Sequence, residues 1–216
     1  MDVLSTHDFA TPAQLATLCQ VQPPAISKAL KQLADQSLVI NESGFRPNIL
    51  RLSAQGARVM DTRQPAGRRT PSASVQQHAC HRNEAGLLLA RKYPGFHWTP
   101  KAQLLAHGLR PAIGEHGAID RAGLSILVLL DDYVMAPGRI LRTWQRRHTP
   151  DIAYTRDPTG RRWCDLANHF IVVTNSRQQA DRHRAWIESY NRQCKDTVDR
   201  LPDIELLTIE PLWRLY

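Results

Sequence analysis

The stretch that decides the fold of the amino-terminal part is residues 11–39, TPAQLATLCQVQPPAISKALKQLADQSLV. Thr11 is a suitable helix cap and Pro12 suits a first helical position, so a helix is predicted over residues 11–20. After the break VQPP, apolar residues recur at helical spacing and predict a second helix over residues 23–36. The stretch therefore predicts two short helices joined by a tight turn.

The second of these helices separates an apolar face from a polar one. Ile26 and Leu30 lie four residues apart and anchor the helix in a core. The polar residues at its start and on its outer face are Gln22, Ser27, Lys28, Lys31 and Gln32. Gln can bind an adenine edge through two hydrogen bonds, whereas Lys and Ser reach guanine edges or phosphates. These residue types therefore predict contacts to the major groove of double-stranded DNA.

The residues that follow the second helix predict a β-hairpin. Residues 38–40 are apolar and β-prone, NESG at 41–44 is a turn signal, and residues 48–52 form the return strand. A short helix is predicted to start at Ser53. The hairpin supplies three further predicted DNA contacts, Arg46, Asn48 and Arg51.

Helix, tight turn, helix and hairpin in this order are the pattern of a winged helix-turn-helix domain. The stretches ATLCQVQPPAISKALKQLADQSLV (16–39) and ILRLSAQGARVM (49–60) resemble the recognition unit, wing and following helix of MarR-type proteins. The resemblance implies a DNA-binding domain over residues 1–62. Only ten residues precede Thr11, so the first helix of that family is expected to be short or missing here. Another helix from the C-terminal part would then pack in its place.

The composition changes after residue 61, where Pro, Gly, Ser and Arg predict a basic flexible linker over residues 63–77. Residues 78–216 are expected to form an α/β domain around a mixed sheet. Its predicted elements are helix 78–92, helix 100–109, strand 124–135, helix 139–147, hairpin 152–166, strand 170–174, helix 176–195 and strand 205–209. The predicted fold class is therefore α+β, with a winged helix-turn-helix before a mixed α/β domain.

Composition and charge narrow the class of protein. The chain has 216 residues, of which 42% are hydrophobic and 22% charged, and these globular values exclude a disordered chain and a coiled-coil rod. The formal net charge of +8 favours an anionic partner such as nucleic acid. Residues 1–60 have five basic and four acidic side chains, so the excess lies further along the chain. There, Arg139, Arg142 and Arg146 share one helix face and complete the predicted DNA-binding set; the alternative is a solvated face balanced by acids.

Other chemistries have little support in the sequence. The four cysteines form no C-x-x-C pair, which predicts reduced thiols in a cytoplasmic protein. We expect no secretory signal and no membrane span, because the longest apolar run, residues 126–130, is too short. His78, Cys80 and His81 form a tight cluster, but on a helix Cys80 points away from the two histidines, so no metal is predicted. We expect no cofactor, because phosphate-loop, dinucleotide-binding and hydrolase motifs are missing.

The order of parts resembles a second family, the replication-relaxation proteins of mobile elements and some mobilisation relaxases. The resemblance rests on a His-containing helix after a basic linker, TPD at 149–151 and the strand 170–174. It implies a nuclease-like PD-(D/E)xK fold, in which an Asp and a Glu hold a divalent metal. Asp151 occupies the place of that Asp, but the strand that should supply the Glu and its partner has Val172 and Thr174. No catalytic residue is therefore assigned; Asp151 is the candidate, and Asp165 is the nearest alternative carboxylate.

Three functions stay open at this point. The first is a sequence-specific DNA-binding protein, a transcriptional regulator of a plasmid, phage or integrated element, which binds DNA as a homodimer. Its C-terminal domain would add phosphate contacts, dimerise or dock a protein partner. The second is a DNA-nicking, relaxase-like enzyme that uses Asp151. The third is a protein-interaction module that does not bind DNA.

Overall fold

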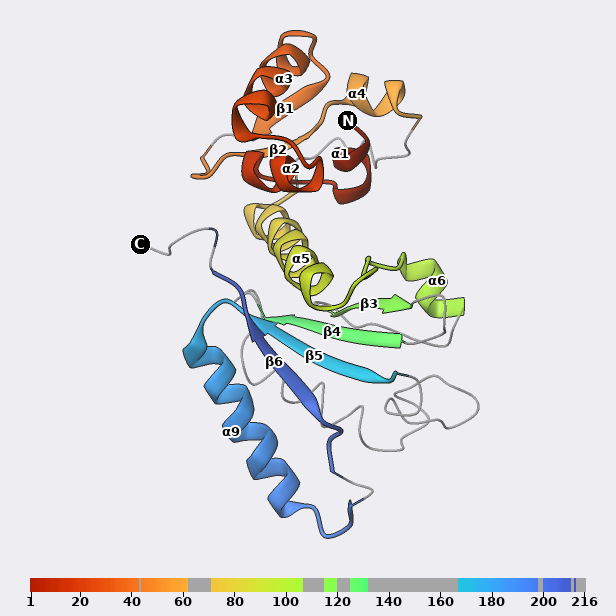
Figure 1. The fold of residues 1–216 in the computed structure, drawn as a ribbon, viewed down its shortest axis with the longest axis vertical. Coiled ribbons are helices and arrows are strands. Elements are labelled where there is room, and N and C mark those ends of the chain that lie inside the picture. Colours follow the sequence, from red (N-terminus) through yellow and green to blue (C-terminus); the bar gives the residue numbers. More distant parts are fainter. Residues whose placement is uncertain are drawn as a thin grey trace. The chain divides into compact units, whose positions relative to one another are not determined.

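The chain folds into two compact units with a mixed α+β composition, as the sequence predicts for its fold class (Figure 1). The computed structural model describes residues 1–42, 44–61, 71–106, 115–119, 125–131, 167–197, 200–210 and 212. Unit 1 comprises Met1–Glu84 with Pro211–Tyr216, and unit 2 comprises Ala85–Glu210.

Unit 1 is mainly helical and contains one small antiparallel sheet. Its elements are α1 (Asp2–His7), α2 (Pro12–Leu18), α3 (Pro23–Asp35), β1 (Val39–Glu42), β2 (Ile49–Leu52), α4 (Ala54–Val59) and the first part of α5 (Ala73–Lys92). The two predicted helices, the hairpin strands and the helix after Ser53 are thereby confirmed. α1 has six residues, which agrees with the expectation of a short first helix.

Local hydrogen bonds explain where α2 and α4 begin. The Thr11 hydroxyl accepts a hydrogen bond from the Gln14 backbone N–H at 3.3 Å, and the Gln14 side chain accepts one from the Thr11 backbone N–H at 3.1 Å. This reciprocal capping box satisfies two backbone donors that the first helical turn leaves without partners. The Ser53 hydroxyl caps α4 in the same way, by accepting from the Gly56 N–H at 2.9 Å.

The core of unit 1 lies between its helices and the hairpin. Leu15 of α2, Ile26 of α3 and Leu52 of β2 are buried together, and Leu30 and Leu33 of α3 pack against them half-buried. The four- and three-residue spacing of the α3 residues brings them onto one face, as the sequence predicts. This packing fixes which face of α3 is left to solvent.

Helix α5 begins earlier than the sequence predicts. It starts at Ala73, so residues 73–77, which the sequence assigns to the linker, are helical. The earlier part of the expected linker, residues 62–70, lies outside the described residues. In unit 1, α5 meets α2 through a hydrogen bond from Gln14 Nε2 to the Cys80 carbonyl at 2.8 Å. A later helix therefore completes the amino-terminal core, as expected from the shortness of α1.

Unit 2 is built on a four-stranded mixed sheet in the order β3-β4-β5-β6. The elements not yet introduced are α6 (Lys101–Ala106), β3 (Glu115–Ile119), β4 (Ser125–Asp131), β5 (His169–Thr174), α9 (Arg177–Gln193) and β6 (Ile204–Thr208). β3 runs antiparallel to β4, whereas β4, β5 and β6 are mutually parallel. The mixed sheet is thereby confirmed, whereas β3 has no counterpart among the predicted strands.

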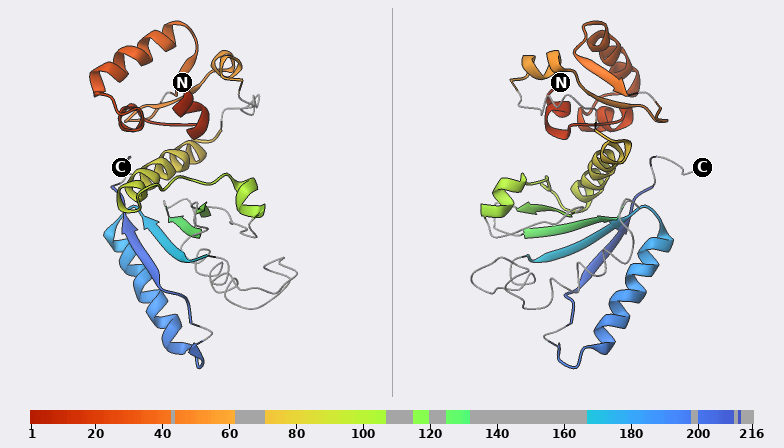
Figure 2. Two further views of the ribbon diagram at one scale, coloured as in Figure 1. Left: turned by 45° about the vertical axis from the view of Figure 1, so that its right-hand side comes forward. Right: turned by 180° about the vertical axis from the view of Figure 1, so that it is seen from behind.

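Helices cover the two faces of this sheet (Figure 2). Ala85 and Leu89 of α5 pack on one face against Val128 of β4 and its neighbours. On the other face, the half-buried Trp186 of α9 packs against the cluster that contains Leu129. Alternate residues of β4 point to opposite faces, so a fully buried strand has an unbroken apolar run.

Candidate nucleic-acid interface

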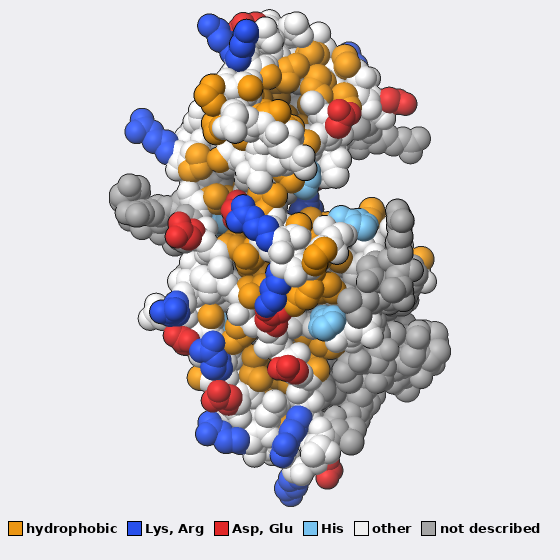
Figure 3. Space-filling model, in the orientation of Figure 1, with side chains coloured by type: hydrophobic (Ala, Val, Ile, Leu, Met, Phe, Trp, Pro, Cys, Tyr) orange, Lys and Arg blue, Asp and Glu red, His pale blue; other side chains and the backbone are white. Residues whose placement is uncertain are grey.

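The outer face of α3 carries the polar residues that the sequence singles out for DNA contact. Every member of this set is exposed, and the set is Gln22, Ser27, Lys28, Lys31 and Gln32. Figure 3 shows Lys and Arg side chains standing out from the end of unit 1 that carries α3. The structure therefore brings all five residues to one helix and leaves them accessible.

The lysines and the serine of this set differ in what they can offer a ligand. Within the described part of the chain, neither Lys28 nor Lys31 makes an ion pair, so both ammonium groups retain their charge for a partner. The Ser27 hydroxyl donates to the Pro23 carbonyl of its own helix at 3.1 Å. Its only hydrogen is thereby used, and towards a ligand Ser27 acts as an acceptor.

The connection between β1 and β2 holds two further predicted contacts in exposed positions. Arg46 and Asn48 are exposed, whereas Phe45 is half-buried against Ile49 and Cys80. Gly44 has φ +93°, in the left-handed region that glycine tolerates best. Phe45 thus anchors this connection to unit 1 while the neighbouring polar side chains face solvent.

Arg51 differs from the other predicted contacts, because its guanidinium is already engaged. Its Nε pairs with the Glu42 carboxylate, and the two side chains are 25% and 14% exposed. Nη1 also donates to the Leu52 carbonyl at 3.4 Å. The ion pair connects β1 and β2, so Arg51 supports the hairpin and its charge is offset within unit 1. The sequence pattern does not reveal this pairing, because Glu42 and Arg51 are nine residues apart.

The remaining predicted site residues lie outside the described residues. These are Arg139, Arg142, Arg146 and Asp151, together with the predicted helix 139–147 and hairpin 152–166. The helix α9 carries other arginines, and its surface in Figure 3 alternates between basic and acidic side chains. On α9, Arg184 pairs with Asp181 at 2.5 Å. The charge of this one arginine is therefore offset within the helix.

A polar network that no sequence pattern indicates holds α5 against the amino-terminal helices. Asn83 donates through Nδ2 to the Phe9 carbonyl at 2.7 Å, and its Oδ1 lies 2.8 Å from His7 Nδ1. Burial lowers the pKa of His7, and the hydrogen bond that His7 Nδ1 donates to Asn83 Oδ1 opposes that shift. Burial also raises the pKa of Cys80 to about 12, so Cys80 is a thiol at neutral pH. A protonated, fully buried thiol is neither a nucleophile nor a metal ligand.

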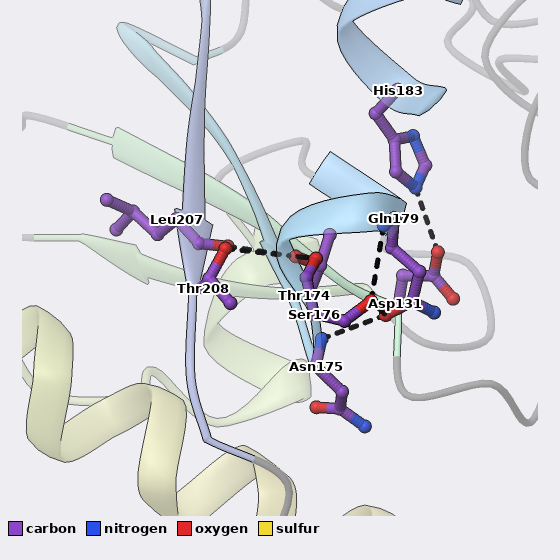
Figure 4. Close-up of polar contacts among 8 residues, drawn as sticks. All are labelled: Asp131, Thr174, Asn175, Ser176, Gln179, His183, Leu207 and Thr208. Atoms are coloured by element: carbon purple, nitrogen blue, oxygen red, sulfur yellow. Dashed lines mark hydrogen bonds and ion pairs between the residues drawn. The ribbon is translucent and has the colours of Figure 1, made fainter. Parts of the chain in front are cut away.

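In unit 2, polar side chains gather where the parallel strands end (Figure 4). Asp131 at the end of β4 is 5% exposed and pairs with His183 of α9, with 2.9 Å between Oδ2 and Nε2. The Thr174 hydroxyl, at the end of β5, donates to backbone carbonyls. Val172 is 1% exposed in the core. These contacts attach α9 to the sheet, and in the described ranges no three His, Cys, Asp or Glu side chains gather as metal ligands.

Comparisons with known proteins do not identify a relative. No model of a protein family, no curated protein and no solved structure matches the chain. Among the helices described here, none has the length and apolar character needed to cross a bilayer.

Proposed function

We propose that unit 1 is a winged helix-turn-helix module and that the protein is a sequence-specific, double-stranded DNA-binding regulator. In this proposal α2 and α3 form the helix-turn-helix, and the β1–β2 hairpin forms the wing. α3 enters the major groove with its exposed polar face, and Arg46 at the hairpin connection contacts the DNA backbone or the minor groove. Two copies related by a two-fold axis would read half-sites about one helical turn apart.

The observation that carries this proposal is the division of α3 into two faces. Ile26 is buried and Leu30 half-buried on the inner face, whereas Lys28 and Lys31 are exposed on the outer face. Glutamines flank the lysines on that outer face, and they supply the paired donor and acceptor that an adenine edge requires. A rigid helix that carries phosphate-binding and base-reading groups together fits a DNA groove. It fits an acidic protein surface less well, because such a surface needs only the positive charges of the helix.

The test is a titration of the full-length protein on the duplex upstream of its own gene and on a scrambled duplex, at two salt concentrations. Specific binding requires at least about a thousandfold preference for the upstream duplex. Lys28→Ala should weaken binding to both duplexes, whereas Lys101→Ala, an exposed lysine on α6, should not. Equal affinity for the two duplexes, lost together as salt rises, would leave only phosphate contacts and contradict sequence-specific recognition.

A further inference from the structure

Unit 2 contains a small cavity whose lining includes none of the proposed DNA-binding residues. Its volume is about 160 Å³. One wall is the turn after α5, residues 93–97, and the other is formed by Ala118 and Ile119 of β3 and Ile126 of β4. Most of these side chains are apolar, so the cavity favours an apolar occupant.

Contacts behind the walls hold this cavity in shape. Phe96 packs edge-to-face on Trp98, with 5.0 Å between the ring centroids. Trp98 in turn lies against Gly86 of α5, where an added Cβ would come within 2.6 Å of the indole nitrogen. On the same turn, the Tyr93 hydroxyl bonds the carboxylate of Glu205. Because Tyr93 and Phe96 are held in this way, their side of the cavity is ordered before a ligand arrives and costs little to organise.

His97 lines this cavity from an exposed position, and one nitrogen of its ring is available to a ligand. His97 Nδ1 lies 3.0 Å from the Gly95 carbonyl oxygen, which only accepts hydrogen bonds, so Nδ1 carries the hydrogen. In the neutral ring Nε2 is then an acceptor, and it has no hydrogen-bond partner among the residues that the structure describes. The left-handed backbone of Gly95, at φ +85°, allows the turn that brings the carbonyl to this position.

We propose that this cavity binds a small molecule with a single aromatic ring and a hydroxyl or amino group. The volume matches one ring, since a cavity of about 150 Å³ lined by Leu, Ile and Phe takes up benzene. The ring packs between Phe96 and Ile126, and the hydroxyl or amino group donates to His97 Nε2. The proposal goes beyond DNA binding and does not depend on it.

The experiment is a titration of the full-length, ¹⁵N-labelled protein with phenol and, separately, with toluene, followed by amide chemical shifts. Both probes should give saturable shifts at Gly95, Phe96 and Ala118. His97→Ala should weaken phenol about three- to tenfold, which corresponds to one neutral hydrogen bond, and should leave toluene unchanged. Ala118→Leu fills the cavity and should abolish both, whereas Leu105→Ala, an exposed apolar side chain on α6, should change neither.

Several results would overturn the proposal. One is the absence of saturable shifts with both probes, and another is equal weakening of phenol and toluene by His97→Ala. If Ala118→Leu does not fold, the His97→Ala comparison still decides the role of His97. N-acetyl-tyrosinamide carries the same phenol group on a peptide unit. Tighter binding of that compound than of phenol would assign the cavity to a tyrosine of a partner protein and would contradict a small-molecule occupant.

Discussion

Replacing Lys31 by Ala removes one positive charge from the exposed face of α3 and leaves the inner face of the helix unchanged. A lysine that neutralises a DNA phosphate releases a condensed counterion, so the binding constant falls as salt rises, with a logarithmic slope of about −0.9 per contact. The exposed basic side chains Lys28, Lys31 and Arg46 therefore predict a slope of about −2.7 for one protomer. Lys31→Ala should reduce this slope by about 0.9, and by about 1.8 if two protomers occupy the duplex.

Fluorescence anisotropy of a labelled duplex between about 50 and 200 mM salt measures this slope directly. Lys31→Ala should weaken binding to the upstream and scrambled duplexes by a similar factor, because a phosphate contact carries no sequence information. Lys101→Ala on α6 is the matched control and should leave the slope unchanged. An unchanged slope in Lys31→Ala, or an equal loss in the control, would refute the placement of the α3 lysines against phosphates.

Four further changes separate the roles assigned to individual residues. Gln32→Ala should weaken binding to the upstream duplex by about 1–3 kcal/mol without changing the salt slope, because the side-chain amide contacts a base edge. Equal weakening on scrambled DNA in the same anisotropy assay would contradict this role. Because Arg51 is paired with Glu42, Arg51→Ala should leave the salt slope of DNA binding unchanged and should lower the free energy of unfolding in urea by up to about 1 kcal/mol. A reduced salt slope would make Arg51 a phosphate ligand. Gly56→Ala should lower the free energy of unfolding by about 1–3 kcal/mol, since the new Cβ would lie 2.1 Å from a backbone carbonyl oxygen; unchanged urea denaturation would refute that close approach. Burial holds the pKa of His7 below 6.5, so the unfolded chain takes up the proton first, and the free energy of unfolding should fall as pH drops below about 6.5. His7→Gln should remove this pH-dependent part of the free energy of unfolding, and identical pH profiles of the two proteins would count against it.

The helices of unit 1 could be predicted because their signals are local. Thr11 and Pro12 mark the start of α2, and the cap hydrogen bonds that confirm them join residues three positions apart. The apolar spacing along α3 likewise predicts which of its faces is buried, and so which polar residues are left for a partner. The exposed candidate set on α3 therefore follows from the sequence alone.

β3 shows where such local reading fails. Its sequence EHGAI contains a glycine and a single β-branched residue, Ile119, so no alternating pattern marks it. It is a strand because it pairs with β4 along its length and because Gly117 lets α6 pack closely, where a Cβ would lie 2.9 Å from a Leu104 methyl group. Both causes are contacts with other elements, and the strand propensity of a residue carries no information about such contacts.

The sequence by itself determined α2, α3, the β1–β2 hairpin and the buried strands β4 and β5, because caps, turns and hydrophobic periodicity act between neighbouring residues. Only the tertiary structure decided that α5 completes the core of unit 1 through Cys80 and Asn83, and that Arg51 is held by Glu42. It also decided that Asp131 is paired with His183. Each of these partners is distant in the chain or lies on another element. Position in space and burial select the partner of a hydrogen bond or ion pair, and the order of residues specifies neither of them.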